Sequence, residues 1–197
     1  MHISEGLLSV PVLITGAFLS LVGLTLGLKK IKNEDIPKVA ILSSAFFVAS
    51  FIHVPVGPTS VHLVLNGLLG MLLGWAAFPS IFVALLLQTF LFQYGGFTTL
   101  GVNTFCMAMP AVLCYYAFRK MLTRSKNIAF LGGFLGGSLS LLISAIFISI
   151  ALVETEKSFF SMATTFFIMY LPISLIEGVI TGFIVIYLKK VKPEVLG

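Results

Sequence analysis

No charged side chain interrupts residues 128–153, which read IAFLGGFLGGSLSLLISAIFISIALV. A helix needs about 20 apolar residues to cross the hydrocarbon core of a bilayer, and this stretch exceeds that length. Residues 7–28 and 166–188 are similarly long and apolar, with Glu177 as an isolated acid. These three stretches predict membrane-spanning helices and decide the fold class.

The composition of the whole chain agrees with this fold class. Hydrophobic residues make up 58% of the 197 residues and charged residues only 10%, whereas a soluble domain averages about 45–50% and about 25%. We therefore predict an all-α, polytopic membrane protein with about seven transmembrane helices in a single domain, residues 1–197. The dipeptide Pro79-Ser80 is interpreted as the turn between the third and fourth helices. The expected helices are 7–28, 36–54, 61–78, 81–94, 102–118, 128–153 and 166–188.

The basic residues predict the orientation of the chain. When the ends of the seven expected helices are assigned alternately to two sides, eleven of the twelve Lys and Arg residues fall on one side. Only Lys157 falls on the other. The positive-inside rule makes the basic side cytoplasmic, so the N-terminus is expected outside and the C-terminus inside. The basic groups alternate with apolar runs, which favours a lipid bilayer over nucleic acid as the partner.

All three histidines, His2, His53 and His62, lie near the expected outer face. With histidine second, the Met1 amine, the His2 amide and the His2 imidazole can chelate one ion through a five-membered and a six-membered ring. Square-planar nitrogen sites of this kind favour Ni(II) or Cu(II), whereas Zn(II) prefers a tetrahedron. His62 is the preferred fourth ligand, and His53 is the alternative.

Three further polar residues are candidates for supporting roles. Asn66 follows His62 by four residues, so on a helix it would share its face and support the imidazole. Asn103, beside the glycine-rich loop 95–101, is expected in a hydrogen-bond network around the site. A carboxylate as deep as Glu177 faces a partner or a polar cavity, and both a cation-binding and a structural role remain open for it.

Small residues recur at four-residue spacing in the second expected helix, including Ala45 and Ala49. Such patterns let helices approach closely, either within the bundle or at a docking face for a partner subunit. No HExxH, Walker-type or GxSxG motif occurs in the sequence, so no catalytic residue is assigned.

Four segments resemble the CbiM/NikM-type substrate-binding (S) subunits of energy-coupling-factor (ECF) transporters for nickel and cobalt. They are MHISEG (1–6), PTSVHLVLNGLLG (58–70), FQYGGFTTLGVNTF (92–105) and IEG (176–178) followed by Thr181-Gly182. The resemblance to the family covers most of the chain. Cys106 departs from the family pattern, because a polar residue is more usual at that position.

The resemblance implies a seven-helix substrate-binding subunit in the cell membrane of a prokaryote, which imports Ni(II) or Co(II), with nickel favoured by the square-planar argument. It implies Met1, His2 and His62 as metal ligands near the outer face. It also implies a transmembrane coupling (T) subunit and two cytoplasmic ATPase (A) subunits as partners, with an additional small membrane subunit possible. An intramembrane metalloenzyme and a ligand-free scaffold subunit are the alternatives.

Overall fold

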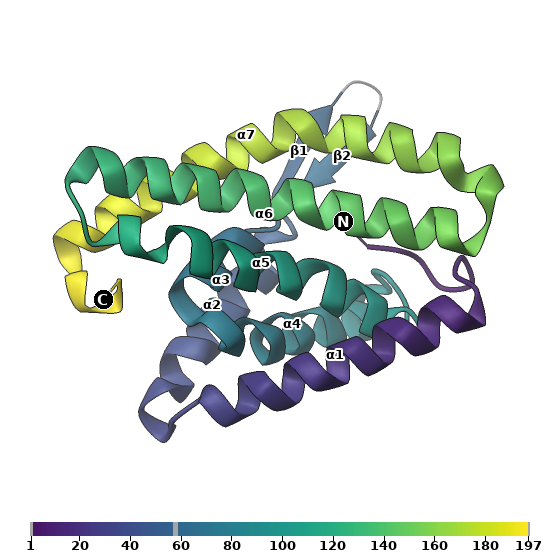
Figure 1. The fold of residues 1–197 in the computed structure, drawn as a ribbon, viewed down its shortest axis with the longest axis horizontal. Coiled ribbons are helices and arrows are strands. Elements are labelled where there is room, and N and C mark those ends of the chain that lie inside the picture. Colours follow the sequence, from purple (N-terminus) through teal and green to yellow (C-terminus); the bar gives the residue numbers. More distant parts are fainter. Residues whose placement is uncertain (1, 57–58, 197) are drawn as a thin grey trace.

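The computed structural model describes residues 2–56 and 59–196, with the backbone alone at residues 53–56 and 59–61. Seven α-helices account for most of these residues (Figure 1). They are α1 (Val10–Lys30), α2 (Ile36–Ala49), α3 (Asn66–Leu73), α4 (Ala77–Phe92), α5 (Leu100–Leu122), α6 (Lys126–Thr155) and α7 (Phe160–Val191). Two strands, β1 (His53–Val56) and β2 (Thr59–His62), form an antiparallel hairpin, and short 3-10 turns η1 (Asn33–Asp35), η2 (Gly74–Ala76), η3 (Lys157–Phe159) and η4 (Pro193–Val195) link or follow the helices.

Apolar side chains cover the outside of the helix bundle. Along α1, Val10, Ile14, Phe18 and Leu21 are each more than 60% exposed, which a water-soluble protein avoids over so large a patch. Five segments of the described chain are long and apolar enough to cross a membrane: α1, the segment from α3 to α4, α5, α6 and the segment from η3 to α7. The prediction of a helical, multi-pass membrane protein is confirmed.

The prediction of a third helix over residues 61–78 is wrong for the first part of that range. Residues 59–62 form strand β2, and the helix begins only at Asn66. The residue before it, Leu65, has a φ of 58°, in the left-handed region that a continuous right-handed helix excludes. At 14 and eight residues, α2 and α3 are also shorter than a helix that crosses a bilayer.

The chain reverses at η2, and not at Pro79-Ser80 as the sequence suggested. Gly74 has a φ of 57°, a conformation that glycine adopts without the steric cost of a Cβ. Before this turn, α3 runs alongside α5, so that Gly70 lies against Ala111 and Gly74 against Tyr115. After it, α4 runs back along α1 towards the opposite end of the bundle. Pro79 lies in the first turn of α4, where proline is tolerated.

Nearly all the basic residues lie at or beside the ends of α1, α5 and α7 and the starts of α2 and α6. These helix ends lie together at the left of Figure 1. Lys189 Nζ donates to the Leu122 carbonyl at 2.9 Å, and Lys38 Nζ lies 3.4 Å from the Val195 carbonyl. At the other end, the Ser9 amide donates to Thr155 Oγ1 at 3.2 Å, which joins the start of α1 to the end of α6. The charge asymmetry read from the sequence is therefore a property of the folded bundle.

The small residues of α2 do not form one continuous outer face. Ala45 is exposed, but Ala49 is only 3% exposed within the molecule. The Ala49 side chain is already covered by the chain's own packing, so a docking face on α2, which stays a prediction, would present Ala45 and not Ala49 at its surface.

Candidate functional site

The N-terminal segment turns back from the start of α1 and enters the bundle beneath α6 (Figure 1). Two side chains of the loop and helix around residue 100 hold it there. Asn103 accepts a hydrogen bond from the Ile3 amide at 2.9 Å and donates to the Ile3 carbonyl at 3.1 Å. Thr99 Oγ1 donates to the same carbonyl at 2.9 Å. Ile3, Asn103 and Thr99 are all buried, so the segment is fixed by a buried polar network directly after His2.

The glycine-rich loop before α5 is shaped to receive this segment. The Glu5 amide donates to the Gly95 carbonyl at 3.3 Å, and Thr98 donates to the Glu5 carboxylate through its hydroxyl and its amide. A Cβ at residue 96 would collide with that carboxylate. Gly95 has a φ of 82°, which disfavours any side chain. The glycines thus allow two backbones to approach closely.

His2 and His62, 60 residues apart in sequence, lie side by side in the structure. Their ring centroids are 5.2 Å apart with an angle of 32° between the planes. His2 Nε2 lies 2.7 Å from Gln88 Oε1 on α4, and the ring centroids of His2 and Tyr94 are 6.2 Å apart. Burial, above all, lowers the pKa of His2 well below its ordinary value. The imidazole is therefore held neutral, which is the form that binds a metal.

His62 ends strand β2, and the backbone of the next residue fixes the tautomer of its ring. The Nδ1 atom lies 2.9 Å from the Leu63 carbonyl oxygen. A carbonyl only accepts, so Nδ1 carries the proton and, in the neutral ring, Nε2 bears the lone pair. In the hairpin, the backbone of His62 pairs with that of His53. The side chain of His53 lies outside the described part of the structure.

The connector, residues 63–65, joins β2 to α3 and is held by Glu177 of α7. The two carboxylate oxygens of Glu177 accept hydrogen bonds from the amides of Val64 and Leu65. Glu177 is fully buried, and a carboxylate in such a place needs partners of this kind. The contacts show a structural role for Glu177: it positions the segment that carries His62.

Asn66 does not support His62 as expected. Because His62 belongs to a strand, the helical spacing that placed the two residues on one face does not apply. The Asn66 amide instead donates to the Met107 carbonyl at 3.1 Å and to Ser144 Oγ at 2.8 Å, and so fastens α3 to α5 and α6. Met1, the remaining proposed ligand, lies outside the described residues.

Within the described residues, no group of three or more His, Cys, Asp or Glu side chains is placed to hold a metal ion. A metal site built on His2 and His62 therefore needs further donors, either from the chain start and the backbone or from His53, whose side chain lies outside the described part. The chelate expected from the sequence has this character, because the terminal amine and a backbone amide supply two of its four nitrogens.

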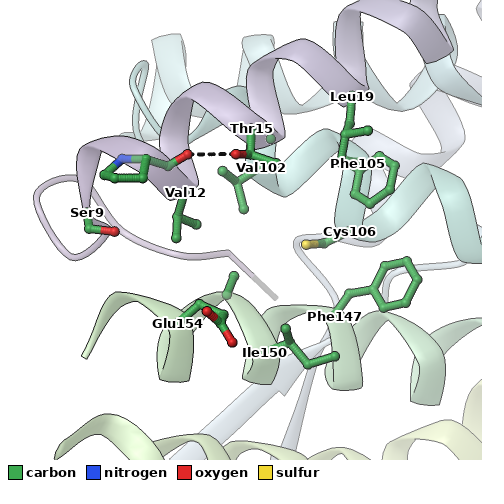
Figure 2. A pocket seen from close by; sticks show the side chains of 13 residues that line it. Ser9, Val12, Thr15, Leu19, Val102, Phe105, Cys106, Phe147, Ile150 and Glu154 are labelled. Carbon is green, nitrogen blue, oxygen red and sulfur yellow. Dashed lines mark hydrogen bonds between the residues drawn. The ribbon is translucent and has the colours of Figure 1, made fainter. Parts of the chain in front are cut away.

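A groove of about 530 Å³ opens elsewhere, between α1, α5 and α6 (Figure 2). Its walls are apolar except at the rim, and Cys106 lies at its base, between Phe105 and Phe147. Of the histidines whose side chains the structure describes, neither His2 nor His62 lines it. Its position on the apolar outside of the bundle suits contact with lipid, and we assign no metal to it.

Two residues that contribute to the candidate site were missed by sequence reasoning, namely Gln88 and Thr99. Gln88 is the single amide side chain within the apolar run of α4. Its polarity was the available signal, because a strongly polar group inside a membrane helix normally has a function or a partner.

Comparisons with known proteins agree with this architecture. Residues 2–195 match the family described as "Cobalt uptake substrate-specific transmembrane region". A putative metal transport protein of Haemophilus influenzae is 39% identical, over all of this chain and 97% of its own length. A cobalt transport protein CbiM of Kyrpidia tusciae is 32% identical over all of this chain and 86% of its own length.

A crystal structure of a transition metal transporter superposes with a TM-score of 0.78 at 31% identity, covering 97% of this chain and 93% of the other. The family match extends over nearly the whole chain, including the N-terminal segment, the connector and the glycine-rich loop that build the site. The chain is therefore a member of the CbiM family of cobalt uptake substrate-specific transmembrane regions.

Proposed function

We propose that this chain is the metal-binding subunit of an ECF-type importer of Ni(II) or Co(II), and that it captures the ion near the outer face. In this proposal the ligands are the Met1 amine, the His2 amide and imidazole, and His62. The observation that carries it is the pairing of the His2 and His62 rings at 5.2 Å. Relatives named as a cobalt transport protein CbiM and as a putative fused nickel transport protein NikMN support the choice of metals.

The ring separation suits two neighbouring corners of a square. With metal–nitrogen bonds of about 2.0 Å, two imidazoles at adjacent corners have centroids about 4.5 Å apart. The observed 5.2 Å exceeds this by less than about 1 Å, which side-chain rotation can close. The square-planar geometry is the reason to favour nickel.

The proposal includes the orientation and the partners. The basic end of the bundle would face the cytoplasm, where two ATPase subunits would act through a transmembrane coupling subunit. The chain itself would form the single substrate-binding domain, residues 1–197, and a further small membrane subunit would be compatible with it. Co-purification with coupling and ATPase subunits expressed from the same operon would test this assembly.

The direct test is Ni(II) and Co(II) calorimetry on purified protein in detergent, comparing the native start with a version extended by several residues. A one-residue extension is unsuitable, because a histidine in third place can complete a four-nitrogen square with the backbone alone. We expect about one ion to bind to the native chain and none to the extended one. Equal binding to both would exclude the Met1 amine as a ligand, and binding to neither would refute the metal-carrier function.

The two histidines of the hairpin provide a matched pair of variants. His62→Ala is expected to abolish binding, whereas His53→Ala is expected to retain it. The reverse result would assign the fourth ligand to His53, the alternative that the sequence left open.

A further inference from the structure

Gln88 is the one buried side chain of the described structure that touches a proposed ligand ring and yet leaves a polar atom of its own unpaired. It is fully buried on α4, and its Oε1 atom lies 2.7 Å from His2 Nε2. Its Nε2 atom has no hydrogen-bond partner within the described part of the chain. An unpaired buried donor destabilises a fold, so packing alone does not explain a glutamine at this position.

We infer that Gln88 is a positioning residue for the metal site, which fixes the tautomer of His2 so that Nδ1 faces the ion. This inference rests on the proposed function. A six-membered chelate ring through the His2 amide can close only at Nδ1, because Nε2 is too far from the backbone. The neutral imidazole carries a single proton, which must therefore reside on Nε2.

The contact with Gln88 places the proton there. An amide oxygen only accepts, so with Oε1 facing the ring, His2 Nε2 donates and Nδ1 keeps its lone pair. With the amide turned over, Gln88 Nε2 would donate to the ring, the proton would move to Nδ1, and the chelate position would be blocked. Gln88 thus selects between a binding and a non-binding imidazole.

The two proposed imidazole ligands then receive opposite tautomers from their surroundings. His62 has its proton on Nδ1, bound to the Leu63 carbonyl, and offers Nε2. His2 has its proton on Nε2, bound to Gln88, and offers Nδ1. The proposed site requires this combination, because His2 chelates through Nδ1 and His62 binds through one nitrogen alone. A hydrogen bond to the nitrogen that does not bind the metal commonly fixes the tautomer of such a ring.

The helix that carries Gln88 is held near both of its ends. Phe78 packs against Gly23 of α1 at one end, and Thr89 Oγ1 donates to the Tyr94 carbonyl at 2.9 Å at the other. The amide oxygen of Gln88 is therefore presented to His2 from a fixed support, as tautomer selection requires.

The test compares Gln88→Leu, which removes the acceptor, with Gln88→Glu, which keeps an acceptor facing Nε2. Ser80→Ala is the control, because it removes a buried polar group two turns away on the same helix. Ni(II) affinity is measured by calorimetry on the native-start chain in detergent, with the visible spectrum of the bound ion and the thermal midpoint of the metal-free protein.

We expect Gln88→Leu to weaken Ni(II) binding by about 10- to 100-fold, with the midpoint of the metal-free protein unchanged or raised. Gln88→Glu should stay within a few-fold of wild type and keep its square-planar spectrum. Wild-type affinity in Gln88→Leu, or an equal loss in Ser80→Ala, would overturn the inference while leaving the proposed function intact. Absence of Ni(II) binding by the wild type would instead refute the proposed function, and the inference with it.

Discussion

Replacing Asn103 with alanine should detach the N-terminal segment from the bundle and weaken metal binding. The substitution removes the acceptor for the Ile3 amide and one of the two donors to the Ile3 carbonyl. The carbonyl keeps Thr99 Oγ1, but the amide, on a residue that is 3% exposed, is left without its partner.

The expected magnitude follows from that single orphaned amide. A buried donor without a partner costs about 1–3 kcal/mol. The cost falls on the docked position of the segment, which brings His2 to the site. A loss of about 2 kcal/mol corresponds to a weakening of up to roughly 30-fold in the Kd for Ni(II).

Calorimetry with Ni(II) in detergent measures this effect, and Thr104→Val is the matched control. Thr104 is the next residue on α5 and is also buried, but its hydroxyl bonds only to the Leu100 carbonyl of its own helix. Thr104→Val should bind Ni(II) as the wild type does. If Asn103→Ala binds within twofold of wild type, or if both variants weaken binding equally, the reasoning that this anchor positions His2 is refuted.

Three further predictions concern other parts of the site and the bundle. Glu177→Gln leaves one amide of the connector without an acceptor, which costs about 1–3 kcal/mol. The thermal midpoint in detergent should therefore fall by several degrees, and an unchanged midpoint would show that Glu177 does not hold the connector. Gly96→Ala should weaken Ni(II) binding measurably, because the added methyl group would displace Glu5 and the segment attached to it, and wild-type affinity would show that the loop does not hold the segment. In intact cells, a membrane-impermeant maleimide should label Lys157→Cys but not Lys192→Cys, since both native cysteines are buried, and the opposite pattern would reverse the proposed orientation.

The membrane class of the fold was predictable because it depends on long apolar runs, which composition and length reveal directly. The start of the third helix was not predictable in the same way. The short apolar run around Val61 and Val64 fits a helix and a strand equally well by periodicity. Nothing local distinguishes them, because the hairpin is completed by pairing with β1 and the connector by Glu177, which lies more than 100 residues further along the chain.

Some residues of the candidate site were likewise predictable from the sequence and others were not. The proximity of His2 and His62 was predictable from the chelate at the chain start together with the family resemblance, and Asn103 was expected as a network residue. Asn66 was misplaced because its proposed role required a helix through His62. Gln88 was missed because its contact with His2 joins residues 86 apart, and only the tertiary structure brings them together.

The paired hairpin also limits how sequences of this kind can change length. Successive residues of a strand point to opposite faces, so a one-residue insertion within Thr59–His62 would turn His62 away from His2. An insertion of two residues would restore its direction but carry it about 7 Å further along the strand. The connector cannot absorb either change, because its amides are hydrogen-bonded to Glu177 from the second residue after His62 onward. We therefore expect natural relatives to gain and lose residues freely in the exposed turn between α5 and α6, and to keep the count from β2 to α3 constant.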